Sequence, residues 1–144
     1  MVGEMCFSCH DSPQGTKDTK ALADSLSYDI LGAAIQVHRE LGPGLLESAY
    51  EACLCRELAL RRIDHQRQLA LPLLYRGMAV DCEYRVDLIV GNLVLVEVKS
   101  IARVLPVHRA QVMTYLKLLK LNLGLLINFN VERLSLGISR IVMG

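Results

Sequence analysis

The chain has 144 residues, which is enough for one compact domain and too few for two. Hydrophobic residues make up 52% of it and its mean hydropathy is +0.32, yet it has no run of about eighteen apolar residues that could span a membrane. The net charge of +1 argues against strong autonomous binding to duplex nucleic acid. The apolar composition predicts a dense core and an apolar surface that could support a homodimer.

The charges are distributed unevenly along the chain. Residues 1–60 carry nine acids and four bases, whereas residues 61–144 carry six acids and twelve bases. No acid lies between Glu97 and Glu132, a stretch that contains Lys99, Arg103, Arg109, Lys117 and Lys120. This asymmetry suits a polyanionic partner, although a solvated helix face rich in lysine predicts the same pattern.

The N-terminal residues have the composition of an extension. Residues 1–24 mix Ser, Asp, Lys, Gly and Pro without periodicity, which predicts a mobile segment before a domain at 25–144. They lack the apolar core of a signal peptide, and the number of cysteines, five, is odd. We therefore expect reduced thiols and a cytoplasmic location.

A cysteine motif in this extension offers a competing interpretation. The sequence CFSCH at 6–10 matches the attachment pattern of c-type haem, but covalent haem requires export. A zinc site would need the two cysteines and the histidine of this motif together with a cysteine from elsewhere in the chain. It is also disfavoured, because Cys53 and Cys55 project from different faces of one predicted helix. We expect the domain to fold without these residues.

Two helices are expected before any strand. The first should extend over 26–41, with Ser25 or Ser27 as its cap and the Gly-Pro-Gly of 42–44 as its end. Its apolar positions recur at helical spacing, at Ile30, Ala33, Ala34, Val37 and Leu41. The second should extend from Leu45 to Arg62, with buried candidates at Leu46, Ala49, Cys53 and Leu58.

The periodicity then changes to that of strands, which we expect at 67–77, 78–90, 92–100, 123–129 and 137–143. Pro72 in the first strand indicates a sheet edge or a bulge, and the nearly all-apolar fourth strand should be internal. Pro106 opens a helix that extends to about Lys120. The order ααβββαββ indicates an α/β fold.

Charged residues interrupt the most strand-like segment, RVDLIVGNLVLVEVKS at 85–100. Glu97 and Lys99 lie two residues apart and project from one face of a strand, while Val94, Val96 and Val98 project from the other. A strict two-residue loop at Gly91-Asn92 would turn Asp87 to the wrong face. We therefore predict an odd-length loop or a bulge that pairs Asp87 with Glu97.

These three residue types suit phosphate chemistry. Two adjacent carboxylates repel each other unless a cation lies between them, and their oxygen atoms suit Mg²⁺ or Mn²⁺. A protonated lysine can orient the attacking water, help to deprotonate it, or stabilise the charge that develops on a phosphate. Asp87, Glu97 and Lys99 together indicate phosphodiester hydrolysis. The alternative is an Asp–Lys or Glu–Lys ion pair that closes the end of the sheet.

The same residues resemble a known signature. Asp87, followed after nine residues by Glu97-Val98-Lys99, is similar to the Asp…Glu-x-Lys signature of the PD-(D/E)XK nuclease superfamily. GLLESAY at 44–50 resembles the Gly-x-x-Glu-x-x-Tyr motif of the GxxExxY family, a small branch of that superfamily. ILGAAIQVHRELGPGLLESAYE, YRVDLIV, VEVKS and TYLKLLKLNLGLLINFNV are also similar to that family, so the likeness covers about residues 25–143. It implies a single restriction-endonuclease-like domain with a central mixed sheet flanked by helices.

The resemblance implies roles for the charged residues. Asp87 and Glu97 would hold the metal, with the Val98 carbonyl as a further ligand, and Lys99 would be the catalytic lysine. Glu47 would be the acidic residue that the superfamily often supplies from its first core helix. Without the resemblance, Glu47 is a first-turn carboxylate that interacts favourably with the helix dipole.

Other residues are expected to support the site or the substrate. Gln111 and Tyr115 form a Gln-x-x-x-Tyr pattern similar to a motif of RecB-like nucleases. Their i,i+4 spacing puts them on one helix face with His108, where they could contact DNA phosphates or the lysine, with capping or packing as the alternative. Arg103 and Arg109 are expected to bind the anionic substrate, Arg109 where relatives often have an acid. His38 and Tyr50 are assigned to packing and hydrogen bonding.

Two functions follow from these expectations. The first is a Mg²⁺- or Mn²⁺-dependent nuclease that hydrolyses phosphodiester bonds of DNA. The second is a noncatalytic module on the same fold that binds nucleic acid or a partner. The near-neutral net charge favours delivery by a partner protein, single-stranded substrates, or dimerisation that joins two basic faces.

Overall fold

A mixed sheet of five strands forms the centre of the molecule. A computed structural model describes residues 13–81 and 83–144, so the CFSCH motif with Cys6, Cys9 and His10 lies outside the described residues. The sheet has the order β1-β4-β5-β6-β7, formed by β1 His65–Leu71, β4 Tyr84–Val90, β5 Val94–Lys99, β6 Leu123–Asn128 and β7 Ile138–Val142. β5 and β6 are parallel and the other neighbours are antiparallel, which confirms the expected central mixed sheet.

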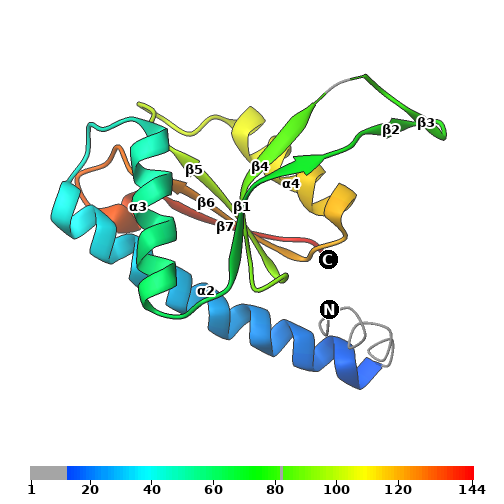
Figure 1. The fold of residues 1–144 in the computed structure, drawn as a ribbon, viewed down its shortest axis with the longest axis horizontal. Coiled ribbons are helices and arrows are strands. Elements are labelled where there is room, and N and C mark those ends of the chain that lie inside the picture. Colours follow the sequence, from blue (N-terminus) through cyan, green and yellow to red (C-terminus); the bar gives the residue numbers. More distant parts are fainter. Residues whose placement is uncertain (1–12, 82) are drawn as a thin grey trace.

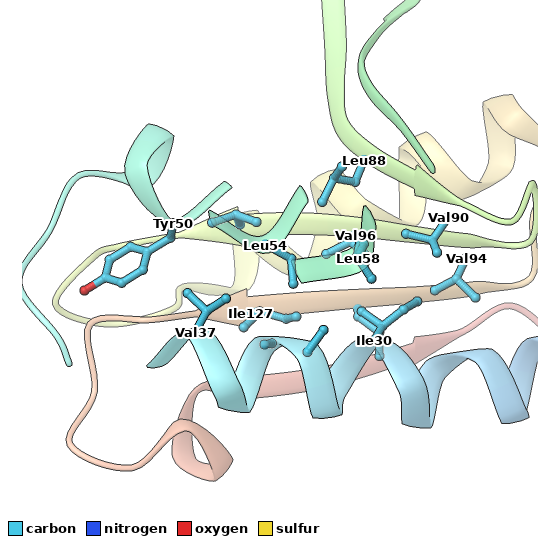
Figure 2. Packing of buried hydrophobic residues seen from close by; sticks show 14 of the residues in the cluster. Ile30, Val37, Tyr50, Leu54, Leu58, Leu88, Val90, Val94, Val96 and Ile127 are labelled. Carbon is cyan, nitrogen blue, oxygen red and sulfur yellow. The ribbon is translucent and has the colours of Figure 1, made fainter. Parts of the chain in front are cut away.

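Helices cover both faces of this sheet (Figure 1). α2 (Pro13–Leu41) and α3 (Glu47–Leu60) pack on one face, and α4 (Pro106–Leu119) packs on the other. Figure 2 shows the first interface, where Ile30 and Val37 of α2 and Leu54 and Leu58 of α3 meet the valines of β4 and β5. In β5 the valines therefore face α2 and α3, as the alternation predicts, and Glu97 and Lys99 are turned toward the α4 side.

The first helix begins earlier than the sequence pattern predicted. α2 begins at Pro13 rather than at residue 26, so residues 13–24 are helical instead of irregular. Ala23 packs in the core, seven residues before Ile30 and fourteen before Val37, so it continues the apolar stripe of the helix by one more repeat. The expected boundary between residues 24 and 25 therefore falls inside this helix.

The two serines expected to cap that helix lie in its interior. Ser27 is 1% exposed, its hydroxyl donates to the backbone oxygen of Asp24 at 2.6 Å, and it accepts from Arg140 of β7 at 2.9 Å. Serine bonding to the preceding turn is common inside helices, and here it also ties α2 to the far edge of the sheet. The expectation of a cap at Ser25 or Ser27 is wrong because the polar residues before them are helical too.

The strands predicted at 67–77 and 78–90 are each interrupted. β1 ends at Leu71, immediately before Pro72, because proline has no N–H to continue the ladder; β1 is an edge strand, as expected. The chain continues into a separate ribbon, β2 (Leu74–Tyr75) and β3 (Met78–Ala79), which projects away from the sheet in Figure 1. It is called the arm below.

α3 lies within the predicted range, but its buried face differs from the expected one. Leu46, an expected core residue, precedes the helix and is 76% exposed, whereas Tyr50, Leu54 and Leu58 are fully buried. The Tyr50 ring stacks on Phe129 with 4.6 Å between centroids, and its hydroxyl donates to the backbone oxygen of Gly42. Tyr50 therefore packs and hydrogen-bonds as expected, and it fixes the turn between α2 and α3.

His38 also has the structural role that the sequence indicated. It is buried, and its Nε2 donates to the backbone oxygen of Val131 at 2.8 Å, which anchors the loop after β6 to α2. In the described part of the chain, no helix combines the length and the apolar composition needed to cross a membrane.

Candidate active site

Asp87 and Glu97 lie opposite each other in the β4–β5 hairpin. Three residues, Gly91 to Leu93, separate the paired residues Val90 and Val94. Gly91 and Asn92 have φ values of 59° and 58°, a left-handed conformation that glycine and asparagine tolerate. Because this register pairs Leu88 with Val96, the next row outward pairs Asp87 with Glu97. The predicted odd-length loop is confirmed.

At this row the two carboxylates replace hydrogen bonds between backbones. The N–H of Asp87 donates to Oε2 of Glu97, and the N–H of Val98 donates to Oδ2 of Asp87, both at 2.8 Å. The alternation of side chains breaks here as well, since Leu88 packs on the α2 and α3 side whereas Val86 packs on the α4 side. One oxygen of each carboxylate is thus fixed by the backbone, and the second oxygen lies outside these two bonds.

Burial raises the pKa of both carboxyl groups. Glu97 is 4% exposed, and burial, followed by the negative charge of Asp87, raises its pKa to about 8. Burial also raises the pKa of Asp87 to about 6, with a further contribution from Glu51. Backbone donors and Lys99 lower both pKa values but do not offset burial. The site therefore has too little positive charge for its carboxylates, and a bound cation would relieve this.

Lys99 follows these carboxylates at the end of β5. It is half-buried, and its charge acts on both Asp87 and Glu97. Within residues 13–81 and 83–144, however, it forms no ion pair with either of them. The alternative interpretation required such a pair to close the sheet end, so the structure does not support it.

A third carboxylate reaches the site from α3. Glu51 is 5% exposed; its Oε2 accepts from Nε of Arg67 at 2.6 Å, and both its oxygens accept from Nε2 of Gln68 at 3.0 and 2.9 Å. Gln68 also donates to Oδ1 of Asp87 at 3.3 Å. The charge of Glu51 raises the pKa of both Asp87 and Glu97, so the three carboxylates interact.

Glu51, Arg67 and Gln68 are not among the site residues predicted from the sequence. A signal for Glu51 was present, because it follows Glu47 by four residues and therefore shares its helix face. Gln68 had no such signal: it lies on β1 with a φ of 56°, a conformation that strand residues other than glycine rarely adopt. Its contribution depends on this local backbone, which turns its amide toward both acids.

Glu47 lies at the rim of the same region. It is exposed at the first position of α3, where its charge is favourable with the helix dipole. Its Oε2 also accepts from the N–H of Ser100 at 3.3 Å, so it contacts the residue that follows Lys99. The position is compatible with both roles that the sequence suggested for it.

On α4, Gln111 and Tyr115 share one helix face, as their spacing predicts, and they bond to each other. Nε2 of Gln111 donates to the Tyr115 hydroxyl at 3.0 Å. Burial, and then the charge of Glu97, raises the pKa of Tyr115, which therefore lies within electrostatic reach of the site. His108 has the capping role, because its Nδ1 accepts from the N–H of Leu105 at 2.8 Å.

The two expected substrate-binding arginines lie outside this hydrogen-bonded group. Arg103 is exposed in the connection after β5, and Arg109 is exposed in the first turns of α4. Neither forms an ion pair within the described ranges. Both guanidinium groups are thus accessible to an anion.

Asn128 is a supporting residue that the sequence analysis also missed. It is 2% exposed and pairs with Lys99 across the parallel strands β5 and β6. Its Oδ1 accepts from the N–H of Ile101 and its Nδ2 donates to the Ile101 oxygen, both at 3.0 Å. Asn128 therefore fixes the chain immediately after Lys99.

Asn128→Ala is expected to lower the free energy of unfolding by about 2 kcal/mol, because it leaves the N–H of Ile101 without a partner and the Ile101 oxygen with only the longer bond from Asn130. Urea unfolding measures this. The matched control is Asn130→Ala, because Asn130 is half-buried and its amide makes only a 3.3 Å bond to the same Ile101 oxygen. Equal losses in the two variants would contradict the role assigned to Asn128.

The donor set at this site fits a hard divalent cation. Asp87, Glu97 and Glu51 supply carboxylate oxygens, which Mg²⁺ and Mn²⁺ prefer, and Mg²⁺ commonly uses one or two carboxylates plus retained waters. Among the residues described, no three His, Cys, Asp or Glu side chains are already arranged around one point as ligands. Arg67, Gln68 and two backbone N–H groups hold their oxygens instead.

Comparison with known families agrees with this geometry. A mixed sheet of five strands with helices on both faces is the architecture of a restriction-endonuclease-like domain. The model of the PD-(D/E)XK nuclease superfamily matches residues 24–141, which is most of the chain. The chain therefore belongs to the PD-(D/E)XK nuclease superfamily. No curated protein and no solved structure matches it significantly.

Proposed function

We propose that the chain is a Mg²⁺- or Mn²⁺-dependent nuclease that hydrolyses phosphodiester bonds of DNA. The observation that carries this proposal is the pairing of Asp87 with Glu97 beside Lys99, in a chain of a nuclease superfamily. The two carboxyl groups have raised pKa values and are under-neutralised, which favours cation binding. Membership of the GxxExxY branch is part of the proposal and rests on GLLESAY at 44–50.

In this proposal Asp87 and Glu97 hold the metal ion, with the Val98 carbonyl as a further protein donor. When bound, the ion would supply Lewis acidity toward the phosphate and would lower the pKa of a bound water. Lys99 extends from the same strand face, so its Nζ would orient that water and stabilise the charge that develops on the phosphate. Tyr115 and Gln111 would cover the α4 side of the reacting group.

The helix acid of the proposed site is better supplied by Glu51 than by Glu47. Glu51 is buried and is linked to Asp87 through the Gln68 amide, whereas Glu47 is exposed and bonds to Ser100. Glu47 remains a proposed member of the site at its rim. Arg103 and Arg109 would contact the phosphates on either side of the scissile bond.

A noncatalytic or partner-dependent module is the second candidate function, and the arm favours it. The arm exposes large apolar side chains on both of its faces: Leu74 (62%), Tyr75 (67%) and Met78 (73%). An isolated two-stranded ribbon is marginal in water, so a partner protein or a second copy of the chain would stabilise it. A partner could also deliver the substrate to a chain whose net charge is only +1.

The cytoplasmic location stays a prediction.

The direct test is cleavage of labelled single-stranded, duplex and nicked DNA by the full chain, with Mg²⁺, with Mn²⁺ and with a chelator. We expect products that require the metal and that are absent with Asp87→Asn, because the asparagine oxygen can still accept the Val98 N–H while it removes the charge that binds the metal. No product on any substrate, from protein shown to be folded, would favour the noncatalytic module.

A further inference from the structure

Arg67 is the cation that neutralises Glu51 in the metal-free site. The side chain of Glu51 is 7% exposed, and a carboxylate this deeply buried requires a partner. Nε of Arg67 is 2.6 Å from Oε2 of Glu51, and no other cation within the described residues pairs with that carboxylate. The hydrogen bond to Glu51 raises the pKa of Arg67, and the charge of Asp87 raises it further, so the guanidinium belongs to the same group of charges.

The two cations of this group are held differently. Lys99 belongs to the central strand β5 and forms no ion pair in the described structure, whereas Arg67 belongs to the edge strand β1 and bonds directly to an acid. The Arg67 side chain is 43% exposed, whereas that of Glu51 is 7% exposed. It can therefore move into solvent without any change in the sheet.

A metal ion bound by Asp87 and Glu97 would lie close to Glu51, the carboxylate that Arg67 contacts. Gln68 donates to Glu51 and to Asp87 with one amide nitrogen, so these two carboxylates lie within one side chain of each other. The Arg67 guanidinium occupies Oε2 of Glu51, an oxygen that could otherwise ligate that ion.

We propose that Arg67 is a positioning residue that acts as a counter-ion of Glu51 and competes with the divalent metal for it. In the metal-free chain Arg67 pairs with the buried carboxylate and fixes its orientation. Metal binding requires its guanidinium to release Glu51, so Arg67 sets the metal affinity of the site. This inference rests on the proposed function only in requiring a metal at Asp87 and Glu97.

The test is calorimetric titration of the full chain with Mn²⁺ in the absence of DNA. Arg67→Gln removes the charge but keeps a hydrogen-bond donor for Glu51, and we expect it to bind Mn²⁺ about fivefold more tightly than the wild type. Arg67→Lys keeps the charge and is expected to bind Mn²⁺ as the wild type does. The matched control is Arg85→Gln, because Arg85 lies on β4 and bonds to Glu83 and to the Gln68 backbone rather than to a carboxylate of the site.

A second comparison isolates the pair. In a Glu51→Gln background the Arg67→Gln change should no longer alter Mn²⁺ affinity, because the carboxylate in competition is gone. Thermal unfolding without metal identifies a variant that fails to fold; if Arg67→Gln does so, Arg67→Met, which also removes the charge, carries the test and should likewise bind Mn²⁺ more tightly than the wild type and Arg67→Lys. Unchanged or weaker Mn²⁺ binding by folded Arg67→Gln would overturn this inference and leave the proposed nuclease standing. Absence of Mn²⁺ binding by the folded wild type would overturn both.

Discussion

Lys99→Ala is expected to leave the chain folded while it lowers metal-dependent DNA cleavage by about 100- to 1000-fold, the usual cost of removing one group that stabilises charge in a transition state. Lys99 forms no ion pair in the described structure, so its removal breaks no direct contact with an acid. Single-turnover cleavage at saturating Mg²⁺ measures the chemical step, and urea unfolding of the same preparation measures the fold.

The matched control for this prediction is Lys117→Ala. Lys117 is an exposed lysine in the last turn of α4, so its removal takes the same charge from the chain away from the carboxylates. Its cleavage rate should stay within about threefold of the wild type, because an exposed charge contributes little. Loss of the fold in Lys99→Ala, with Lys117→Ala stable, would instead indicate that Lys99 is a structural residue of the sheet end.

The centre of the site was predictable because β5 follows the two-residue period of strands. Once Glu97 and Lys99 are assigned to one face, an odd-length loop or a bulge is needed to bring Asp87 to them, and the hairpin has the odd-length loop. The same period identified Val94, Val96 and Val98 as core residues. Both predictions depend only on the alternation of side chains along a strand and on the length of one loop. They therefore require no knowledge of the tertiary structure.

The surroundings of the site were not predictable in this way. Gln68 reaches two acids because of a single left-handed backbone conformation on an edge strand, and no periodicity encodes such a deviation. Pro72 marked the interruption of β1, but the pattern did not show that the chain would continue as a projecting arm. The start of α2 was not predicted for another reason. The residues before Ser25 are mostly polar, and Ala23 is the first of the described residues of this helix to pack in the core, so the apolar stripe is weak there.

The metal-free chain is expected to lose stability as the pH rises from about 4.5 to about 8. The pKa of Glu97 is raised from 4.5 to about 8 in the folded chain, and that of Asp87 from 3.8 to about 6. Across this window the unfolded chain releases protons that the folded chain retains, so higher pH favours unfolding, which is the reverse of the effect of a salt-bridged carboxylate. The loss should amount to several kcal/mol, with the larger share from Glu97, and should level off above pH 8.

Glu97→Gln is expected to remove most of this pH dependence. The amide oxygen can still accept the N–H of Asp87, but it carries no charge to desolvate, so the variant should be more stable than the wild type at pH 8 by roughly 3 kcal/mol and similar to it near pH 4.5. Urea unfolding at both pH values with a chelator measures the difference. Glu132→Gln, an exposed acid, is the control and should retain the wild-type dependence.

The effect of Mg²⁺ on the free energy of unfolding tests whether the destabilising charge of Glu97 serves to bind a metal. If Asp87 and Glu97 bind a divalent ion, millimolar Mg²⁺ should restore stability to the wild type above about pH 8, where both carboxylates ionise, and should do little for Glu97→Gln. The stability that the folded chain loses by keeping two acids in contact is then recovered by the ion that they bind. A wild-type stability that rises with pH between 4.5 and 8 without metal would show instead that neither carboxylate is under-neutralised, and the electrostatic basis for a metal at this hairpin would be lost.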